Sequence, residues 1–219
     1  MYKDFLDRVC HSYDFLALDA MGVLFTQTDE VEQVLQEHLF ACECEYDESR
    51  LILQYLSATS GDLSEPELCQ TLGLTKTQAS SLPQRYTLMP QLIDLLEEAQ
   101  NNYIGLSCMS NGIASWLKAA GRHNHLDTYI ENWIISSDIG IRKPATSFFA
   151  KAAEQLGAAP QRILLVDNRP ANLDAAHQLG FGTLWLSATA NTDVAHPRLG
   201  SLEDLTDAIR STAPLAVSA

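Results

Sequence analysis

Short runs of consecutive apolar residues recur along the chain, separated by longer stretches with apolar residues at every third or fourth position. The runs have the length of buried strands and cover Phe15–Leu18, Tyr103–Met109, Trp133–Ser136, Ile163–Val166 and Thr183–Leu186. Continuous apolar strands are typical of a parallel sheet that helices cover on both faces. The pattern therefore predicts an α/β fold with a doubly wound, Rossmann-like parallel sheet.

The stretches between these strands predict helices, and proline or glycine residues mark several of their ends. Proline suits the first turn of a helix, whereas glycine adopts the left-handed conformation that commonly follows the last turn. The prolines near predicted helix starts are Pro90, Pro144 and Pro170, and the glycines after predicted ends are Gly157 and Gly180. A terminal helix is predicted to begin at Ser201, which has the residue type of an N-cap.

Residues 30–86 interrupt the alternation of strands and helices. They predict helices alone, over Val31–Cys42, Glu48–Ser57 and Ser64–Leu72. A helical insertion directly after the first strand predicts a cap over the carboxyl end of that strand, where ligands bind in open α/β sheets. We therefore expect a core domain of residues 1–29 and 87–219 and a cap domain of residues 30–86.

The charge of the chain narrows the class of partner. There are 14 Lys and Arg residues against 28 Asp and Glu, which gives a formal net charge of −14. Such a chain disfavours nucleic acid and anionic membrane as partners, but local cations can still bind a small anionic substrate. No signal peptide, membrane-spanning run or disulfide framework is evident, which predicts a cytoplasmic protein. Nothing in the sequence indicates an oligomeric state.

Polar residues that carry chemistry follow the predicted strands. Asp19 comes after the first, Ser110 after the second, Lys143 in the loop after the third and Asp167 after the fourth. The carboxyl ends of parallel strands meet at one edge of a sheet, so we expect these residues to converge. A carboxylate can act as a nucleophile in phosphoryl transfer, and a pair of carboxylates suits Mg²⁺. A serine hydroxyl and a lysine can stabilise the phosphoryl charge.

These segments read LDAMGVL, MSN, RKP and VDN in chain order. Their order and spacing resemble the haloacid dehalogenase-like hydrolase superfamily from about Phe15 to Leu186, and Asn172 and Ala176 also match its last motif. The helical insertion is similar to the small helical cap of the first type. The resemblance implies a nucleophile at Asp19, assisted by Ser110 and Lys143.

The resemblance also implies the ligands of the site. Mg²⁺ is expected at the Asp19 carboxylate, the Met21 carbonyl and Asp167. Substrate is expected at the segment formed by Ser110, Asn111 and Gly112.

Two positions depart from the phosphatases of this superfamily. Met21 stands where they carry an aspartate that acts as general acid and base, a group whose contribution to rate is about 10²–10⁴. Asn168 stands where a second acid is common, and an amide can still serve as a hydrogen-bonding group or near a metal. The sequence therefore predicts a phosphatase without the usual proton donor.

Two alternatives remain open beside this prediction. The segments DAMG and SNG are similar to those of 2-haloacid dehalogenases, whose halide leaves without protonation and without a metal. Arg50, which lies in the predicted cap helices, is the candidate to bind the halide in that case. Asp167 favours phosphoryl chemistry, because an unpaired carboxylate beside Asp19 would be repulsive without a cation. The other alternative is a non-catalytic protein that binds a phosphorylated metabolite.

Overall fold

The computed structural model describes residues 12–189 and 193–212. Within them, parallel strands form one six-stranded sheet in the order β3-β2-β1-β4-β5-β6. The strands are β1 (Phe15–Leu18), β2 (Gly105–Ser110), β3 (Asn132–Ile135), β4 (Ile163–Asp167), β5 (Gly182–Leu186) and β6 (Arg198–Leu199). This arrangement confirms the predicted α/β fold, and it adds the short edge strand β6, which the hydrophobic pattern does not predict.

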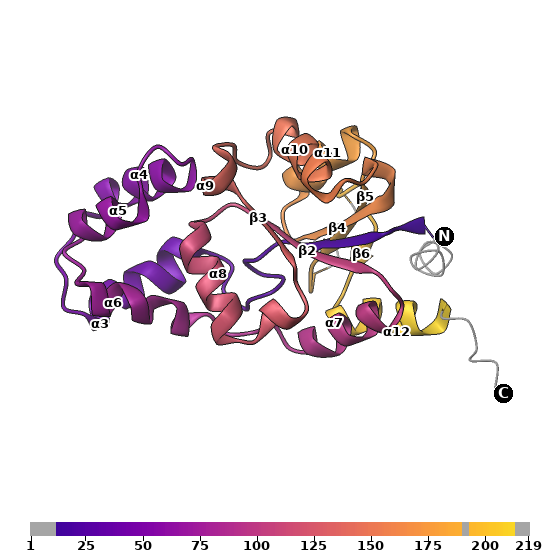
Figure 1. Cartoon of the computed structure of the whole chain (residues 1–219), viewed down its shortest axis with the longest axis horizontal. Helices are drawn as coiled ribbons and strands as arrows, with labels where there is room; N and C mark the ends of the chain where they lie inside the picture. The colour runs from indigo at the N-terminus through magenta and orange to yellow at the C-terminus, as the bar shows by residue number, and fades with distance from the viewer. Residues whose placement is uncertain (1–11, 190–192, 213–219) are drawn as a thin grey trace.

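Helices cover both faces of the sheet (Figure 1). On one face lie α10 (Thr146–Leu156) and α11 (Pro170–Gln178), and on the other lie α7 (Leu92–Asn101) and α12 (Leu202–Thr212). Successive strand residues point to opposite faces. Accordingly, Leu16 and Leu18 of β1 pack into one hydrophobic core, whereas Ala17 packs into the other.

Residues 30–86, which we call the cap segment, contain helices and no regular strand among the described elements. They are the π-helix η1 (Val31–Gln36), α3 (Glu37–Ala41), α4 (Glu48–Thr59), α5 (Glu65–Thr71), α6 (Lys76–Ser81) and the 3₁₀ helix η2 (Leu82–Arg85). The cap segment forms the lobe at the left of Figure 1. The division into core and cap domains stays a prediction.

The remaining helical elements belong to the sheet-bearing part of the chain. They are α8 (Ala114–His123), η3 (Leu126–Thr128), α9 (Ser136–Ile139) and η4 (Pro160–Arg162). The helix predicted to begin at Pro90 begins instead at Leu92, because Gln91 before it is left-handed, with φ 59°. The terminal helix is confirmed and starts at Leu202.

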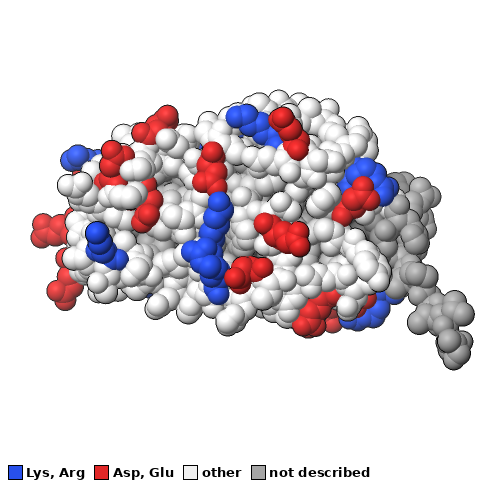
Figure 2. Space-filling view, in the orientation of Figure 1, with Lys and Arg blue, Asp and Glu red and all other residues white. Residues whose placement is uncertain are grey.

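The surface is consistent with the acidic composition. Figure 2 shows acidic side chains scattered over the visible face of both lobes, with basic side chains in small separate groups. Among the described helices, none combines the length and the apolar character that crossing a bilayer requires.

Candidate active site

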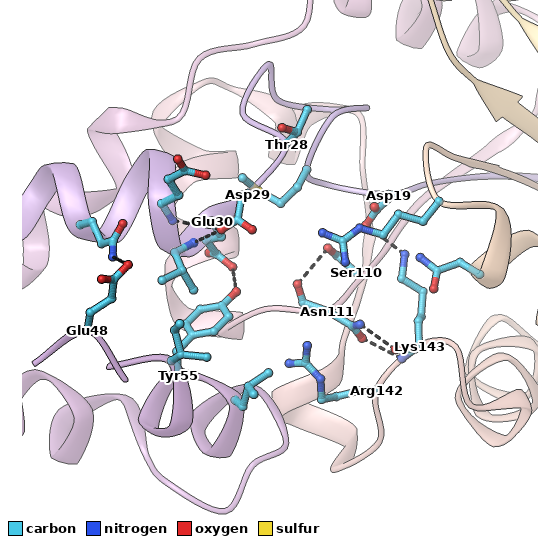
Figure 3. Close-up of a pocket in the computed structure, with 18 residues that line it drawn as sticks. Asp19, Thr28, Asp29, Glu30, Glu48, Tyr55, Ser110, Asn111, Arg142 and Lys143 are labelled. Carbon is cyan, nitrogen blue, oxygen red and sulfur yellow. Dashed lines mark hydrogen bonds and ion pairs between the residues drawn. The ribbon is translucent and has the colours of Figure 1, made fainter. Parts of the chain in front are cut away.

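The structure brings Asp19, Ser110 and Lys143 to one cavity of about 530 Å³, at the carboxyl edge of the sheet (Figure 3). Asp19 directly follows β1, Ser110 ends β2 and Lys143 lies in the loop after α9. The cap segment supplies the opposite wall, including Glu30 and Tyr55. The expected convergence of these three side chains is therefore present.

The Lys143 ammonium is the centre of the polar contacts at the site. Its Nζ lies 2.9 Å from Asp19 Oδ1, and it donates to Asp167 Oδ2 and to the Met109 carbonyl, each at 2.7 Å. Burial disfavours the charged form, but Asp167 and Asp19 outweigh it and raise the pKa of Lys143. Lys143 therefore stays charged and holds the two carboxylates together.

Asp167 is fully buried, and protein donors surround its carboxylate. Oδ1 accepts from the Arg169 backbone N–H at 2.8 Å and from Asn172 Nδ2 at 3.1 Å. Oδ2 accepts from Lys143 and from Asn172 Nδ2 at 2.9 Å. Burial is the main cause that raises the pKa of Asp167, and Lys143 opposes it. These donors therefore orient the Asp167 carboxylate and hold it against Lys143.

Asn168 follows Asp167 and is the second polar side chain at the carboxyl end of β4. Its side-chain Oδ1 is buried and has no hydrogen-bond partner among the described residues. Its amide lies against the loop after β1, since a Cβ on Gly22 would be 2.1 Å from Asn168 Nδ2. A buried amide oxygen without a partner is a ligand of the kind that a hard cation accepts.

The residues present can therefore accept a hard cation. Asn168 adds an amide oxygen to the predicted ligands Asp19, the Met21 carbonyl and Asp167, and that set stays a prediction. Among the described residues, His, Cys, Asp and Glu form no group of three or more that could hold a metal. A cation here would be held by one or two carboxylates, which suits Mg²⁺ because it also keeps water and substrate oxygens.

The segment after β2 positions Lys143. Asn111 Nδ2 donates to the Lys143 carbonyl at 2.8 Å, and Asn111 Oδ1 accepts from the Lys143 N–H at 2.7 Å. Ser110 is almost fully buried and lines the cavity. Gly112 gives space to Glu30, since a Cβ on Gly112 would lie 3.2 Å from Glu30 Oε2.

Glu30 is a buried carboxyl in the cavity wall. The hydroxyl groups of Tyr55 and Tyr86 both donate to it (Figure 3 shows the Tyr55 contact). Burial raises the pKa of Glu30 to about 7, although the two hydroxyls oppose the rise. Hydrophobic periodicity cannot reveal this group, because its partners are distant in sequence.

Arg50 is not brought to the cavity. It is exposed on α4, where its backbone N–H bonds to Asp47 at the helix N-cap, and it is not among the lining residues. Two other arginines line the cavity instead, Arg142 and Arg169. Arg142 precedes Lys143 and Arg169 follows Asn168. This adjacency to the motifs is the signal by which the sequence could have identified the two arginines.

Comparisons with known proteins place the chain among hydrolases. A family model described as haloacid dehalogenase-like hydrolase matches residues 13–180. The (S)-2-haloacid dehalogenase 4A of Burkholderia cepacia is 24% identical over 116 residues, which cover 53% of this chain and 50% of that protein. Enolase-phosphatase E1 of Klebsiella oxytoca is 31% identical over 122 residues, which cover 54% and 52%. The chain spans about half the length of these curated relatives.

A solved structure has the same fold over nearly its whole length. It is a wild-type enzyme of the same superfamily from Bacteroides thetaiotaomicron, in complex with magnesium and inorganic phosphate. The TM-score is 0.64 at 18% identity, and the match covers 83% of this chain and 98% of that one.

Proposed function

The chain belongs to the haloacid dehalogenase-like hydrolases, and we propose that it is a Mg²⁺-dependent phosphatase whose nucleophile is Asp19. The observation that carries this proposal is the Asp19–Lys143–Asp167 arrangement. Lys143 and the Ala20 N–H, at 2.9 and 2.8 Å, both contact Asp19 Oδ1. They orient the carboxylate so that Oδ2 can attack a phosphorus atom in the cavity.

In the proposed reaction, Asp19 Oδ2 forms a bond to phosphorus while the bond to the leaving oxygen breaks. The Ser110 hydroxyl donates to a phosphoryl oxygen, and Lys143 offsets the charge that gathers there. Water then hydrolyses the aspartyl-phosphate and releases inorganic phosphate. Asp19, the Met21 carbonyl and Asp167, together with the Asn168 amide, would hold Mg²⁺, which supplies charge neutralisation when bound.

Two measurements test the nucleophile. Asp19→Asn should abolish hydrolysis of phenyl phosphate, and it should also prevent the beryllofluoride adduct that the unaltered protein forms with Mg²⁺. Asp138→Asn, an exposed carboxylate on α9, is the matched control and should retain both. Retention of activity in Asp19→Asn would remove the proposal.

A dehalogenase is the second candidate, and Met21 is the observation that favours it. Displacement of halide from a 2-haloacid by Asp19 requires no proton at position 21 and no metal. The likeness to the Burkholderia dehalogenase supports this candidate, whereas the likeness to the Klebsiella enzyme supports the phosphatase. A screen of aryl phosphates and 2-haloacids, with Mg²⁺ and with chelator, distinguishes them by the release of phosphate or halide. Release of neither would favour the non-catalytic binding protein.

A further inference from the structure

Two arginine side chains line the cavity without a carboxylate partner. Neither Arg142 nor Arg169 forms an ion pair with any residue that the structure describes. Lys143, the third cation of the cavity, is fully engaged by Asp19 and Asp167. Arg142 is half-buried whereas Arg169 is exposed. A half-buried guanidinium without an anionic partner is unfavourable until an anion binds.

The two guanidinium groups also act on each other. Arg142 is half-buried, and burial is the main cause that lowers its pKa. The charge of Arg169 lowers that pKa further, whereas Tyr55 and Glu30 oppose the decrease. Arg142 also donates to Thr59 of α4, so it reaches from the core loop to the cap segment. Two positive charges that line the same cavity and repel each other form an arrangement that an anion between them would stabilise.

The carboxylates that line the cavity form no ion pair with either arginine among the described residues, although the charge of Glu30 favours the charged form of Arg142. Glu30 accepts from Tyr55 and Tyr86, and Asp29 Oδ1 accepts from the N–H groups of Val31 and Glu32 at 2.9 and 3.0 Å. Glu32 and Glu48 line the cavity as well, so the feature that favours an anion is the pair of unpaired guanidinium groups and not a net positive charge.

We propose that Arg142 and Arg169 bind a second anionic group on the part of the substrate that leaves from phosphorus. The substrate class is then a small compound with a phosphate and a second anion, either a carboxylate or another phosphate. A guanidinium suits both groups, because its planar N–H donors form paired bonds to their oxygens. The inference rests on the proposed function, because the first anion is the phosphate that Asp19 attacks. Binding measurements test the second anion site without turnover.

Calorimetry with stable phosphonates provides the test. The probes are phosphonoacetate, 3-phosphonopropionate and 4-phosphonobutyrate, each compared with the alkylphosphonate of equal length, in the presence of Mg²⁺. At least one carboxylated probe should bind about 10- to 100-fold more tightly than its partner, as expected for hydrogen bonds between charged groups. An alkane bisphosphonate of the best length distinguishes a carboxylate site from a phosphate site.

Variants assign the preference to the arginines. Arg142→Gln should reduce the affinity ratio to about 1, and Arg169→Gln should reduce it partly. Arg122→Gln, on α8 and outside this cavity, is the matched control and should keep it. If Arg142→Gln does not fold, Arg142→Lys replaces it. Lysine keeps the charge but loses the paired N–H donors, so Arg142→Lys should reduce the ratio partly, as Arg169→Gln should.

The inference is overturned if no carboxylated probe binds more tightly to the unaltered protein, or if the variants leave the ratio unchanged. If Arg142 served only to pack the cap segment, Arg142→Gln would lower the affinity for both probes of a pair equally. Turnover of phenyl phosphate tests the phosphatase separately. A binding preference without turnover would reject the phosphatase, whereas turnover without a preference would reject only the second anion site.

Discussion

Lys143 separates two buried carboxylates that would otherwise repel each other. Removing its charge leaves Asp19 and Asp167 close together in a site where their side chains are at most 8% exposed. Lys143→Met should therefore lower the free energy of unfolding by about 3–5 kcal/mol, the usual effect of breaking a buried ion pair. Urea denaturation measures the difference.

Lys118→Met is the control for this prediction. Lys118 pairs with Asp138 at 2.6 Å, but the two side chains are 38% and 46% exposed, so solvent screens the pair. Its loss should change the free energy of unfolding by about 1 kcal/mol or less. Equal effects of the two substitutions would contradict the structural role of Lys143.

Met21 lacks the proton that an alkoxide leaving group requires. If the chain is a phosphatase, aryl and acyl phosphates should be its better substrates, and alkyl phosphates should be poor. Met21→Asp should then raise kcat/KM for alkyl phosphates by up to about 10²–10⁴, the contribution of a general acid, and should change aryl phosphates less. Steady-state kinetics on matched alkyl and aryl phosphates measures this.

A dehalogenase would respond differently to Met21→Asp. Halide needs no proton, and a second anion beside Asp19 would oppose binding of a carboxylate substrate. If the variant folds and binds Mg²⁺ but improves no alkyl phosphate, Met21 is not simply a lost acid.

The sequence motifs identify residue positions better than they identify roles. Asp19, Ser110 and Lys143 could be predicted because each follows a strand whose apolar run is plain. The motif could not show that Asn172, one turn into α11, occupies the oxygens of Asp167. Nor could it show that Asn168 Oδ1 is buried without a hydrogen-bond partner among the described residues. That depends on how closely the loop at Gly22 approaches the Asn168 side chain.

The loop after β1 is the element on which this approach depends. Gly22 has φ +77°, and a Cβ there would meet the Asn168 amide at 2.1 Å. Gly22→Ala should lower the free energy of unfolding by about 1–2 kcal/mol for the left-handed backbone and by about 1–3 kcal/mol more for displacement of Asn168. Under the proposed function, calorimetry should also show weaker Mg²⁺ binding.

Gly73→Ala separates these two contributions. Gly73 has φ +69°, but nothing lies within 4 Å of the Cβ that alanine would add. The control should therefore show the backbone effect alone in urea denaturation. If Gly22→Ala is no more destabilising than Gly73→Ala, the close approach of Asn168 is not a constraint.

Among the helices, those with apolar residues at helical spacing could be predicted from the sequence, and those without this periodicity could not. Helix α5 begins after Ser64, whose capping box with Glu67 stands in the sequence, and the predicted helix over Ser64–Leu72 matches it. Helix α6 has the same device at Thr75 and Gln78 but has no buried residue, so hydrophobic periodicity misses it. Strand β6 has only two residues and relies on pairing with β5.

Across the whole molecule, Glu30 lies where the cap segment joins the core. The two chain segments that join them run side by side, with hydrogen bonds from Thr26 N–H to the Thr87 carbonyl at 2.8 Å and from Met89 N–H to the Leu24 carbonyl at 2.9 Å. Glu30 lies at the end of the first segment. Tyr86 in the second segment and Tyr55 in α4 both donate to it. A single carboxyl group thus links three parts of the cap segment beside its junction with the core, and its protonation should affect stability.

The direction of that effect follows from the raised pKa of Glu30. Its value in the folded protein is about 7, against an ordinary value of 4.5. Between these pH values the folded protein retains a proton that the unfolded chain has lost, so the unfolded state binds fewer protons and stability falls as pH rises. The contribution is complete below pH 4.5 and is lost by about pH 7. A difference of this size corresponds to at most about 3 kcal/mol.

Urea denaturation of the unaltered protein and of Glu30→Gln at several pH values between 5 and 8 isolates this contribution, because other titrating groups cancel in the difference. We expect the stability of the unaltered protein, relative to Glu30→Gln, to decrease by up to about 3 kcal/mol over that range. The Tyr86 hydroxyl lowers the pKa of Glu30, so Tyr86→Phe should extend the decrease to higher pH. A difference between the unaltered protein and Glu30→Gln that does not change with pH would mean that Glu30 is ionised in the folded protein throughout, with the two hydroxyls outweighing its burial.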